Sequence, residues 1–234
     1  MIAKNNLTGN ASATSVRRLS AGTPKVLLTG FEAFGGDTIN PSWRVVSALD
    51  GQVIEGHVMV AAQLPCVFAQ ASQQLRRLLA LHKPRLVICV GQAGGRSALS
   101  IERIAINVMD ARIADNAGQQ PIDQPVVIGG PAAYFSTLPI KAMLQAVVHA
   151  GVPAEISQTA GTFVCNQVFY ALLHDLKKTR RLPGARGGFI HVPFLPGQGV
   201  PHMSLDHMMQ GLQAAIGCAL VNAEDAAIGA GTLS

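Results

Sequence analysis

A cysteine at the start of a predicted helix is the residue with the clearest capacity for chemistry in this sequence. Cys165 lies in a glycine-led segment, 161–166 (GTFVCN), between a strand-like run at 155–159 and an apolar-periodic helix that continues through Leu176. Unpaired N–H groups and the helix dipole favour a thiolate at such a place. We therefore predict a nucleophilic thiol with a lowered pKa, so that its alkylation continues well below about pH 8.5. The alternative is a cysteine that only packs.

A nucleophilic cysteine needs a base and a group that orients the base. His191 closes a strand-like segment, and an imidazole there can take the thiol proton and deliver it to a leaving amine. A carboxylate orients an imidazole best, and spacing alone leaves Glu102, Asp110 and Asp206 open for that part. Taken singly, His191 is also compatible with a structural histidine, and Glu102 with a surface ion pair to Arg103.

The elements that must position these residues alternate between strands and helices. Short apolar runs at 25–30 and 85–91 end in glycine, which is typical of strands buried on both faces. The remaining predicted strands are 53–63, 100–108, 155–159 and 188–192, and the other predicted helices are 41–49, 66–82, 140 to a stop at Gly151, and 204–222. Residues 109–138 are rich in turn signals. This alternation predicts a three-layer α/β/α sandwich around a mixed, mostly parallel twisted sheet of the phosphorylase or hydrolase kind.

In such sheets, ligands bind beyond the carboxyl ends of the strands. The residues that follow or close predicted strands are Phe31, Phe34, Gln92, Cys165 and His191. We therefore predict that these groups meet at one edge of the sheet.

Composition bounds the class of protein. The chain has 234 residues, of which 49% are hydrophobic and 13% charged, which suits one globular domain, placed at 25–222. The low charge indicates that sister subunits cover part of the surface. Residues 1–24 are predicted to be a disordered N-terminal extension, and 223–234 a loose C-terminal end. No apolar run reaches membrane-spanning length, and no secretory signal is present, so we expect a cytoplasmic protein.

The charge and the cysteines exclude further classes. Three of the basic residues behind the net charge of +5 lie in the N-terminal extension, which leaves about +2 on the rest. No basic run is interleaved with aromatics, so nucleic acid binding is not indicated. Cys66, Cys89 and Cys218 lie in apolar contexts and are predicted to be free structural thiols. There is no CxxC and no metal-like spacing.

Several separate segments resemble one known family in its order. They are 29–36 (TGFEAFGG), 40–42 (NPS), 91–96 (GQAGGR), 102–107 (ERIAIN), 110–116 (DARIADN), 161–166 (GTFVCN) and 191–196 (HVPFLP). With this set, which runs through nearly the whole body of the chain, the sequence resembles the type I pyroglutamyl peptidases, also called pyrrolidone-carboxylate peptidases. The resemblance implies a cysteine exopeptidase that removes an N-terminal pyroglutamyl (5-oxoprolyl) residue from peptides through a thioester acyl-enzyme. It also implies a cytosolic, metal-free enzyme without a cofactor, commonly a homotetramer.

The resemblance assigns roles position by position. It implies Cys165 as nucleophile, His191 as acid and base, and Glu102 as the carboxylate that orients His191. It implies Arg112 and the backbone N–H of Cys165 as oxyanion stabilisers. The positions that match the substrate pocket are Phe31, Phe34, Asn40, Gln92, Ile113, Phe163 and Val164. A flat, neutral ring suits an aromatic pair such as Phe31 and Phe34, and an apolar pocket penalises a charged glutamate or α-amine.

The departures from the family pattern are the N-terminal extension, the segment 96–101, and Ala114 and Ala117, where Pro and Glu are more usual. Two other readings stay open. One is a cysteine amidase for another small cyclic or acyl group. The other is a phosphorylase-like or small-ligand-binding domain, for which 94–96 (GGR) is a candidate phosphate loop.

Overall fold

The computed structural model of the protein describes residues 22–179 and 181–231. The predicted N-terminal extension, residues 1–24, therefore lies outside the described residues except for 22–24. Of the predicted loose end, residues 223–231 are described and carry no helix or strand. That segment is tied to the body, because Asp225 Oδ1 accepts hydrogen bonds from the N–H groups of Lys141 and Ala142 at 2.8 and 3.0 Å.

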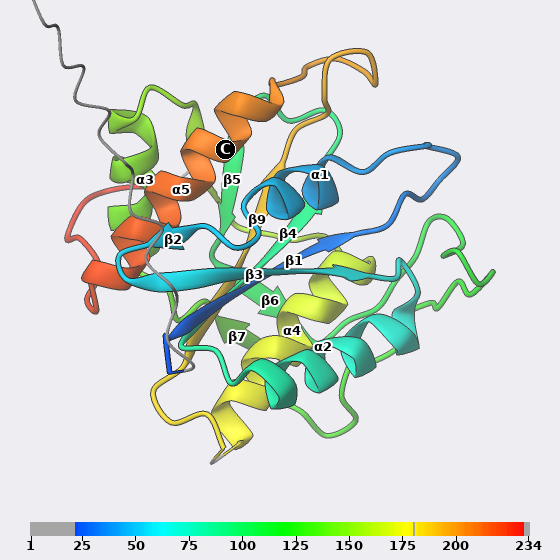
Figure 1. Ribbon diagram of the computed structural model, residues 1–234. Coiled ribbons are helices and arrows are strands. Elements are labelled where there is room, and N and C mark those ends of the chain that lie inside the picture. The colour runs from blue at the N-terminus through cyan, green and yellow to red at the C-terminus, as the bar shows by residue number, and fades with distance from the viewer. Residues whose placement is uncertain (1–21, 180, 232–234) are drawn as a thin grey trace, which may run out of the picture.

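A seven-stranded sheet forms the middle of the molecule (Figure 1). Its strands, in the spatial order β2-β3-β1-β4-β9-β5-β8, are β2 (Val53–Ile54), β3 (His57–Leu64), β1 (Lys25–Phe31), β4 (Leu86–Gln92), β9 (Arg186–Val192), β5 (Leu99–Glu102) and β8 (Ala154–Ser157). Strands β3, β1, β4 and β9 run parallel to one another, whereas β5 is antiparallel to β9 and β8 is parallel to β5. The predicted mixed, mostly parallel sheet is confirmed.

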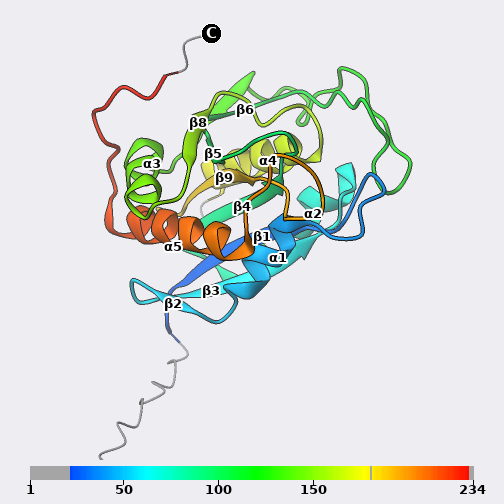
Figure 2. The same ribbon diagram turned by 90° about the horizontal axis from the view of Figure 1, so that it is seen from above.

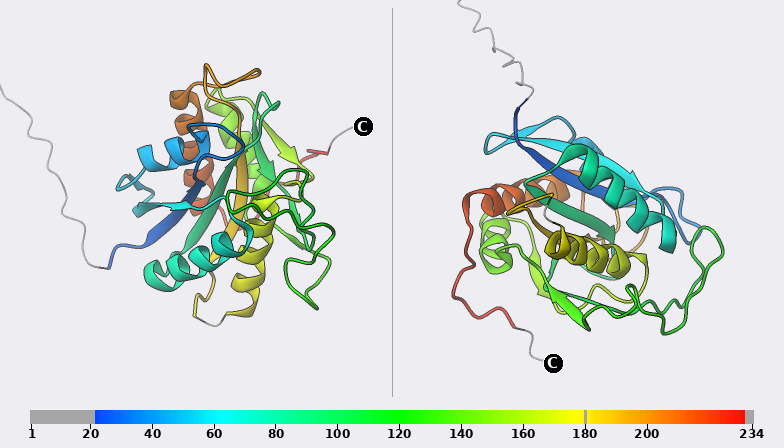
Figure 3. Two further views of the ribbon diagram at one scale, coloured as in Figure 1. Left: turned by 90° about the vertical axis from the view of Figure 1, so that its right-hand side faces the viewer. Right: turned by 90° about the horizontal axis from the view of Figure 1, so that it is seen from below.

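In the described part of the chain, five helices cover the two faces of the sheet (Figures 1 and 2). They are α1 (Pro41–Ala48), α2 (Phe68–His82), α3 (Ile140–His149), α4 (Val164–Lys178) and α5 (Leu205–Val221). Helices α1, α3 and α5 pack on one face, and α2 and α4 lie side by side on the other, as the view from below in Figure 3 shows. The central strands are buried on both sides by these layers, which is why their sequences are continuous apolar runs rather than alternating ones.

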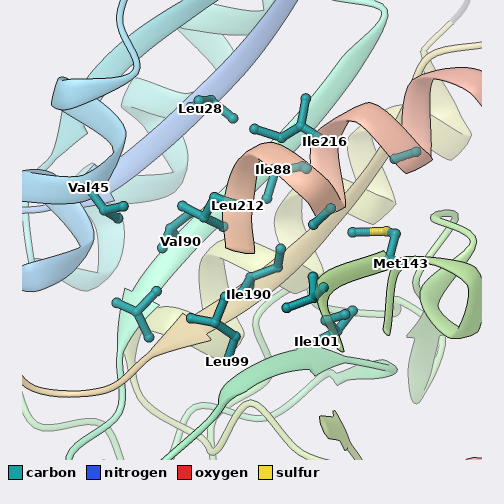
Figure 4. Close-up of a cluster of buried hydrophobic side chains, with 14 of the residues drawn as sticks. Leu28, Val45, Ile88, Val90, Leu99, Ile101, Met143, Ile190, Leu212 and Ile216 are labelled. Carbon is teal, nitrogen blue, oxygen red and sulfur yellow. The ribbon is translucent and has the colours of Figure 1, made fainter. Parts of the chain in front are cut away.

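Strand alternation divides the core into two clusters. Figure 4 shows the cluster under α1, α3 and α5, to which β5 contributes Leu99 and Ile101 and β9 contributes Ile190. The cluster under α2 and α4 receives Phe189 from β9. Successive side chains of a strand point to opposite faces of the sheet. The residues of β5 and β9 that are next to Leu99, Ile101 and Ile190 in sequence therefore face α4. This places Glu102 and His191 on the α4 face of the sheet.

The predicted strand at 100–108 is two strands in different sheets. Strand β5 ends at Glu102, and β6 (Ile104–Ile106) pairs instead with β7 (Ala133–Phe135) in a separate antiparallel ribbon. Strand β7 lies in the segment predicted to be loop. Between β6 and β7 the chain runs along one edge of the molecule, shown in green in Figure 2.

The predicted strand at 53–63 is a hairpin. Strands β2 and β3 pair antiparallel around Glu55 and Gly56, whose φ values are 45° and 72°. Two consecutive left-handed residues make the tight turn that suits the twist of a hairpin.

Candidate active site

Helix α4 begins with the segment that contains Cys165. Phe163 is its N-cap, and among the described residues no side chain caps the first turn. The backbone N–H groups at this helix start therefore keep their capacity to bind an oxyanion. Thr162 joins the turn before α4 to the loop at Asp110. Its Oγ1 donates to the carbonyl of Asp110 at 2.6 Å, and its carbonyl accepts from the N–H of Asp110 at 3.0 Å.

The sulfur of Cys165 lies over the end of β4. A Cβ atom placed on Gly91 would come within 2.8 Å of Cys165 Sγ and 2.8 Å of Phe189 Cζ. Only glycine leaves room for the sulfur here. Gly91 is the register partner of His191 in the parallel pair of β4 and β9, so the thiol and the imidazole occupy neighbouring positions on the same face of the sheet.

His191 contacts Glu102 across the antiparallel pair of β9 and β5. His191 Nδ1 lies 2.7 Å from Glu102 Oε1, and the residues are 4% and 0% exposed. A carboxylate only accepts hydrogen bonds, so Nδ1 carries the proton and Nε2 is left as the acceptor. Of the three carboxylates that spacing left open, the structure brings Glu102 to the imidazole.

The partner of Glu102 is not Arg103. Arg103 follows the end of β5 and donates to the carbonyl of Ala230 at 3.5 Å, beside the core cluster under α1, α3 and α5. Glu102 Oε1 accepts from Arg96 Nη1 at 2.8 Å. This arginine was missed as a site residue, because it lies in the loop before β5 and its spacing gives no signal of the contact.

Cys165 reaches this place by a different route from the one predicted. Strand β8 runs opposite to β4 and β9, so its carboxyl end does not lie at their carboxyl edge. The turn at 158–163 carries the chain back, and α4 then starts over Gly91 and extends until Leu172 and Leu176 lie against Gly187 near the start of β9. The groups do meet, but the argument from a shared strand direction is wrong for Cys165.

The prediction of a lowered thiol pKa is also wrong. Burial raises the pKa of the Cys165 thiol well above its usual value, and the negative charges nearby, including Glu102, raise it further, whereas Arg96 lowers it. The cost of removing the charged sulfur from water outweighs the helix start. A thiol with a raised pKa needs a base to take its proton during attack.

Aromatic side chains gather around Phe163, the N-cap of α4. The ring centroids of Phe34 and Phe163 are 6.0 Å apart, and Phe68 meets Phe163 edge-on at 5.2 Å. Phe31 is 2% exposed and packs on Phe189 at 6.4 Å instead. The rings that contact each other are therefore Phe34 with Phe163 and Phe31 with Phe189.

The other predicted pocket positions divide into rim and floor. Ile113 is 48% exposed, and its Cδ1 lies 4.0 Å from where a Cβ of Gly35 would be, so it borders the loop that carries Phe34. Gln92 Nε2 donates to Asp37 Oδ2 of the same loop at 3.0 Å. Val164 is fully buried and belongs to the core below.

Asn40 braces the loop that carries Phe34. Its Oδ1 accepts from the N–H and Oγ of Ser42 at 3.0 and 2.8 Å, and its Nδ2 donates to the carbonyl of Glu32 at 2.9 Å. Ser42 Oγ in turn accepts from the N–H of Phe31 at 2.9 Å. One buried amide thus caps α1 and fixes the chain that leaves β1.

Asn166 and Asn116 are positioning residues that the sequence analysis missed. Asn166 is fully buried; its Oδ1 accepts from the N–H of Ile106 at 3.0 Å, and its Nδ2 donates to the carbonyls of Ile106 and Val108 at 2.9 Å. Asn116 Nδ2 donates to Glu32 Oε1 at 2.9 Å. The signal was present, because both residues end recognised segments, but sequence does not reveal their partners.

Arg112 has no hydrogen bond or ion pair to Cys165, His191 or Glu102. It is exposed and makes no hydrogen bond or ion pair with any residue that the structure describes. The candidate phosphate loop is not an open cradle either, because a Cβ on Gly94 would lie 2.3 Å from the ring of Phe194. In the described ranges, no group of three His, Cys, Asp or Glu side chains could hold a metal ion, and no helix is long and apolar enough to cross a membrane.

Known proteins match this chain over nearly its whole body. The family model described as pyroglutamyl peptidase matches residues 24–222. The chain belongs to the pyroglutamyl peptidase family. It is 56% identical over 211 residues to a pyrrolidone-carboxylate peptidase of Klebsiella pneumoniae, which covers 88% of this chain and 97% of that one. It is 57% identical over 208 residues to a pyrrolidone-carboxylate peptidase of Cupriavidus taiwanensis, with 86% and 95% covered.

Solved structures of the pyroglutamyl peptidase family share the fold. The pyroglutamyl peptidase I of Bacillus amyloliquefaciens superposes with a TM-score of 0.85 at 45% identity, covering 88% of this chain and all of that one. A mutant pyrrolidone carboxyl peptidase of Pyrococcus furiosus gives a TM-score of 0.80 at 44% identity, with 84% and 98% covered. The predicted family is confirmed.

Proposed function

We propose that this cysteine-type pyroglutamyl peptidase removes N-terminal pyroglutamate with Cys165 as nucleophile, His191 as acid and base, and Glu102 as the orienting carboxylate. The observation that carries the proposal is the buried 2.7 Å contact between His191 Nδ1 and Glu102 Oε1, beside the strand position that Cys165 Sγ covers. It supplies a fixed tautomer with a free Nε2 next to the thiol.

The reaction begins with proton transfer. His191 Nε2 takes the proton of the Cys165 thiol as Sγ bonds to the carbonyl carbon of the pyroglutamyl residue, and the carbonyl π electrons move to oxygen. When the oxyanion collapses, the C–N bond breaks and the imidazolium gives its proton to the leaving amine. A pyroglutamyl thioester remains on Cys165.

Water completes the cycle. His191 Nε2 accepts a proton from water as its oxygen bonds to the thioester carbon. Collapse of the second oxyanion breaks the C–S bond, and the imidazolium returns the proton to sulfur. The products are free pyroglutamate and the peptide shortened by one residue.

Oxyanion stabilisation is assigned to the helix start. The N–H of Cys165 belongs to the uncapped first turn of α4, and each such donor typically contributes about 3–4 kcal/mol to the transition state. Arg112 is proposed as a second donor. Its exposed side chain is free to reach a bound substrate, and its loop is joined to the turn before Cys165 through Asp110.

Recognition is assigned to the rim beside the sulfur. Phe34 and Phe163 offer flat apolar surfaces to a flat ring, Ile113 forms the outer wall, and Asn40 holds the loop. Phe31 and Val164 are proposed to support this pocket from the core beneath it. Backbone groups near Gln92 are proposed to meet the lactam. Desolvation without a countercharge excludes a free α-amine.

Three further proposals concern the whole molecule. We propose one domain over residues 25–222, a cytoplasmic location and a homotetramer. The four free cysteines agree with a reducing compartment. Exposed apolar side chains such as Phe135 at 68% and Ile128 at 91% agree with subunit contacts.

A panel of coumarin amides tests the substrate assignment. We expect the pyroglutamyl amide to be hydrolysed at least about 100-fold faster than the prolyl and glutamyl amides, because each of these carries an ammonium group into an apolar site. Rates are measured by fluorescence with and without added phosphate. A preferred prolyl or glutamyl substrate would indicate a different amidase, and phosphate-dependent turnover would indicate a phosphorylase-like enzyme.

A further inference from the structure

One oxygen of the Glu102 carboxylate accepts hydrogen bonds from two side chains. Oε1 meets His191 Nδ1 at 2.7 Å and Arg96 Nη1 at 2.8 Å. Oε2 is buried and has no partner among the described residues. The orientation of this carboxylate is therefore determined at one atom, and the guanidinium is one of the two groups that determine it.

Arg96 also holds the turn that leads to the nucleophile. Its Nη2 donates to the carbonyl of Thr159 at 3.2 Å. The same carbonyl accepts from Ser157 Oγ at 3.0 Å, and Thr159 Oγ1 accepts from the N–H of Gly161 at 3.0 Å. One guanidinium therefore joins the orienting carboxylate to the segment that ends in Cys165.

We propose that Arg96 is a positioning residue, which fixes Glu102 relative to the Cys165 turn and offsets the charge of Glu102 beside the thiol. The proposal rests on the triad proposed above. It assigns Arg96 an effect on kcat through Glu102, and an effect on the reactivity of the sulfur, without contact to substrate.

Burial distinguishes this ion pair from an ordinary surface pair. The side chain of Arg96 is 27% exposed, and exposed pairs stabilise proteins by only about 0–1 kcal/mol. Glu102 is fully buried, however, and removal of the partner of a buried charge leaves that charge uncompensated. In this case the uncompensated charge would lie beside the reacting groups.

Charges around the sulfur agree with the second part of the proposal. Burial raises the pKa of the Cys165 thiol first of all, and Cys66, Glu102 and Cys89 raise it further, while Arg96 lowers it. His191 faces the same position from β9. Loss of Arg96 removes the positive charge that opposes Glu102, so the thiolate population at a given pH must fall.

The variant Arg96→Gln tests the proposal. We expect kcat to fall about 10- to 100-fold with KM little changed, as for the misplacement of a catalytic group by up to about 1 Å. The iodoacetamide reaction of Cys165 at a fixed alkaline pH is expected to slow severalfold. Arg96→Lys keeps the charge but not the two-pronged fork, so it should restore much of the alkylation rate and less of kcat.

The control and the double variant decide the interpretation. Arg103→Gln, on the opposite face of the sheet, is expected to keep activity within about twofold. In an enzyme that already carries Glu102→Gln, the addition of Arg96→Gln should lower kcat by less than about threefold, because the effect of Arg96 passes through Glu102. The proposal is contradicted if Arg96→Gln lowers kcat in the Glu102→Gln enzyme by as much as it does in the wild type. It is also contradicted if both Arg96 variants keep the kcat and the alkylation rate of the wild type. Full activity of Cys165→Ala or Glu102→Gln would contradict the triad instead.

Discussion

Substitution of Cys165 by alanine is expected to lower kcat/KM for a pyroglutamyl-coumarin amide by at least about 10⁵-fold, as loss of a nucleophile does in other acyl-transfer enzymes. The variant keeps the uncapped helix start, the aromatic rim, and the contact between His191 and Glu102. It loses only the atom that forms the thioester. The fold should persist, because the substitution removes one sulfur atom and adds no atom that could clash with Gly91.

Cys218→Ser is the matched control for Cys165→Ala. Cys218 is a half-buried free thiol on α5, in the layer that covers the opposite face of the sheet. Its removal should leave hydrolysis and its inhibition by iodoacetamide unchanged. A Cys165→Ala enzyme that retains more than about a thousandth of the activity would place the nucleophile elsewhere.

Substitution of Glu102 by glutamine is expected to lower kcat by about 10³- to 10⁴-fold, the size of effect seen when the orienting carboxylate of a triad becomes an amide. Glutamine has the same shape, but an NH₂ group that donates hydrogen bonds replaces one of the accepting oxygens. If its NH₂ group faces His191 Nδ1, the ring must carry its proton on Nε2 and cannot accept the thiol proton. The charge that stabilises the imidazolium is also lost.

Glu155→Gln provides a comparison for Glu102→Gln on the adjacent strand. Glu155 accepts from Ser100 Oγ at 2.7 Å and has no contact with the imidazole. Its variant should keep kcat within about twofold. If Glu102→Gln behaved in the same way, the buried contact with His191 would be structural, and another group would have to orient the base.

Local pattern was sufficient for the elements that lie in the middle of the fold. The apolar runs of β1 and β4 read correctly as strands, because burial on both faces leaves a continuous apolar sequence. The start of α4 at Cys165 was found within a residue or so for a similar local reason. The glycine turn and the apolar period that mark a helix start are close to it in sequence.

Pairing partners were not available from local pattern. The apolar positions shift from 99 and 101 to 104 and 106 across Arg103, but this shift does not say that β5 pairs with β9 and β8 while β6 pairs with β7. The reversed direction of β8 has the same origin. Register and strand direction are set by contacts between distant segments, and periodicity carries no information about them.

The site was predictable in its chemistry and not in its electrostatics. Cys165 and His191 followed from residue type and place, whereas Glu102 was chosen by resemblance alone. Strand alternation could have removed Arg103 as its partner, but nothing pointed to Arg96. The sign of the pKa change of the Cys165 thiol was wrong, because it depends on how deeply the sulfur is buried.

The central claim is that Cys165 carries the pyroglutamyl group during turnover. Wild-type enzyme mixed with saturating substrate and quenched in acid within the first turnover can be weighed intact by mass spectrometry and then mapped by peptide digestion. We predict a fraction of the enzyme heavier by one pyroglutamyl acyl group, bound at Cys165 and released by hydroxylamine, and no such species in Cys165→Ala. An acyl group on another residue, or an acylated Cys165→Ala enzyme, would contradict the account.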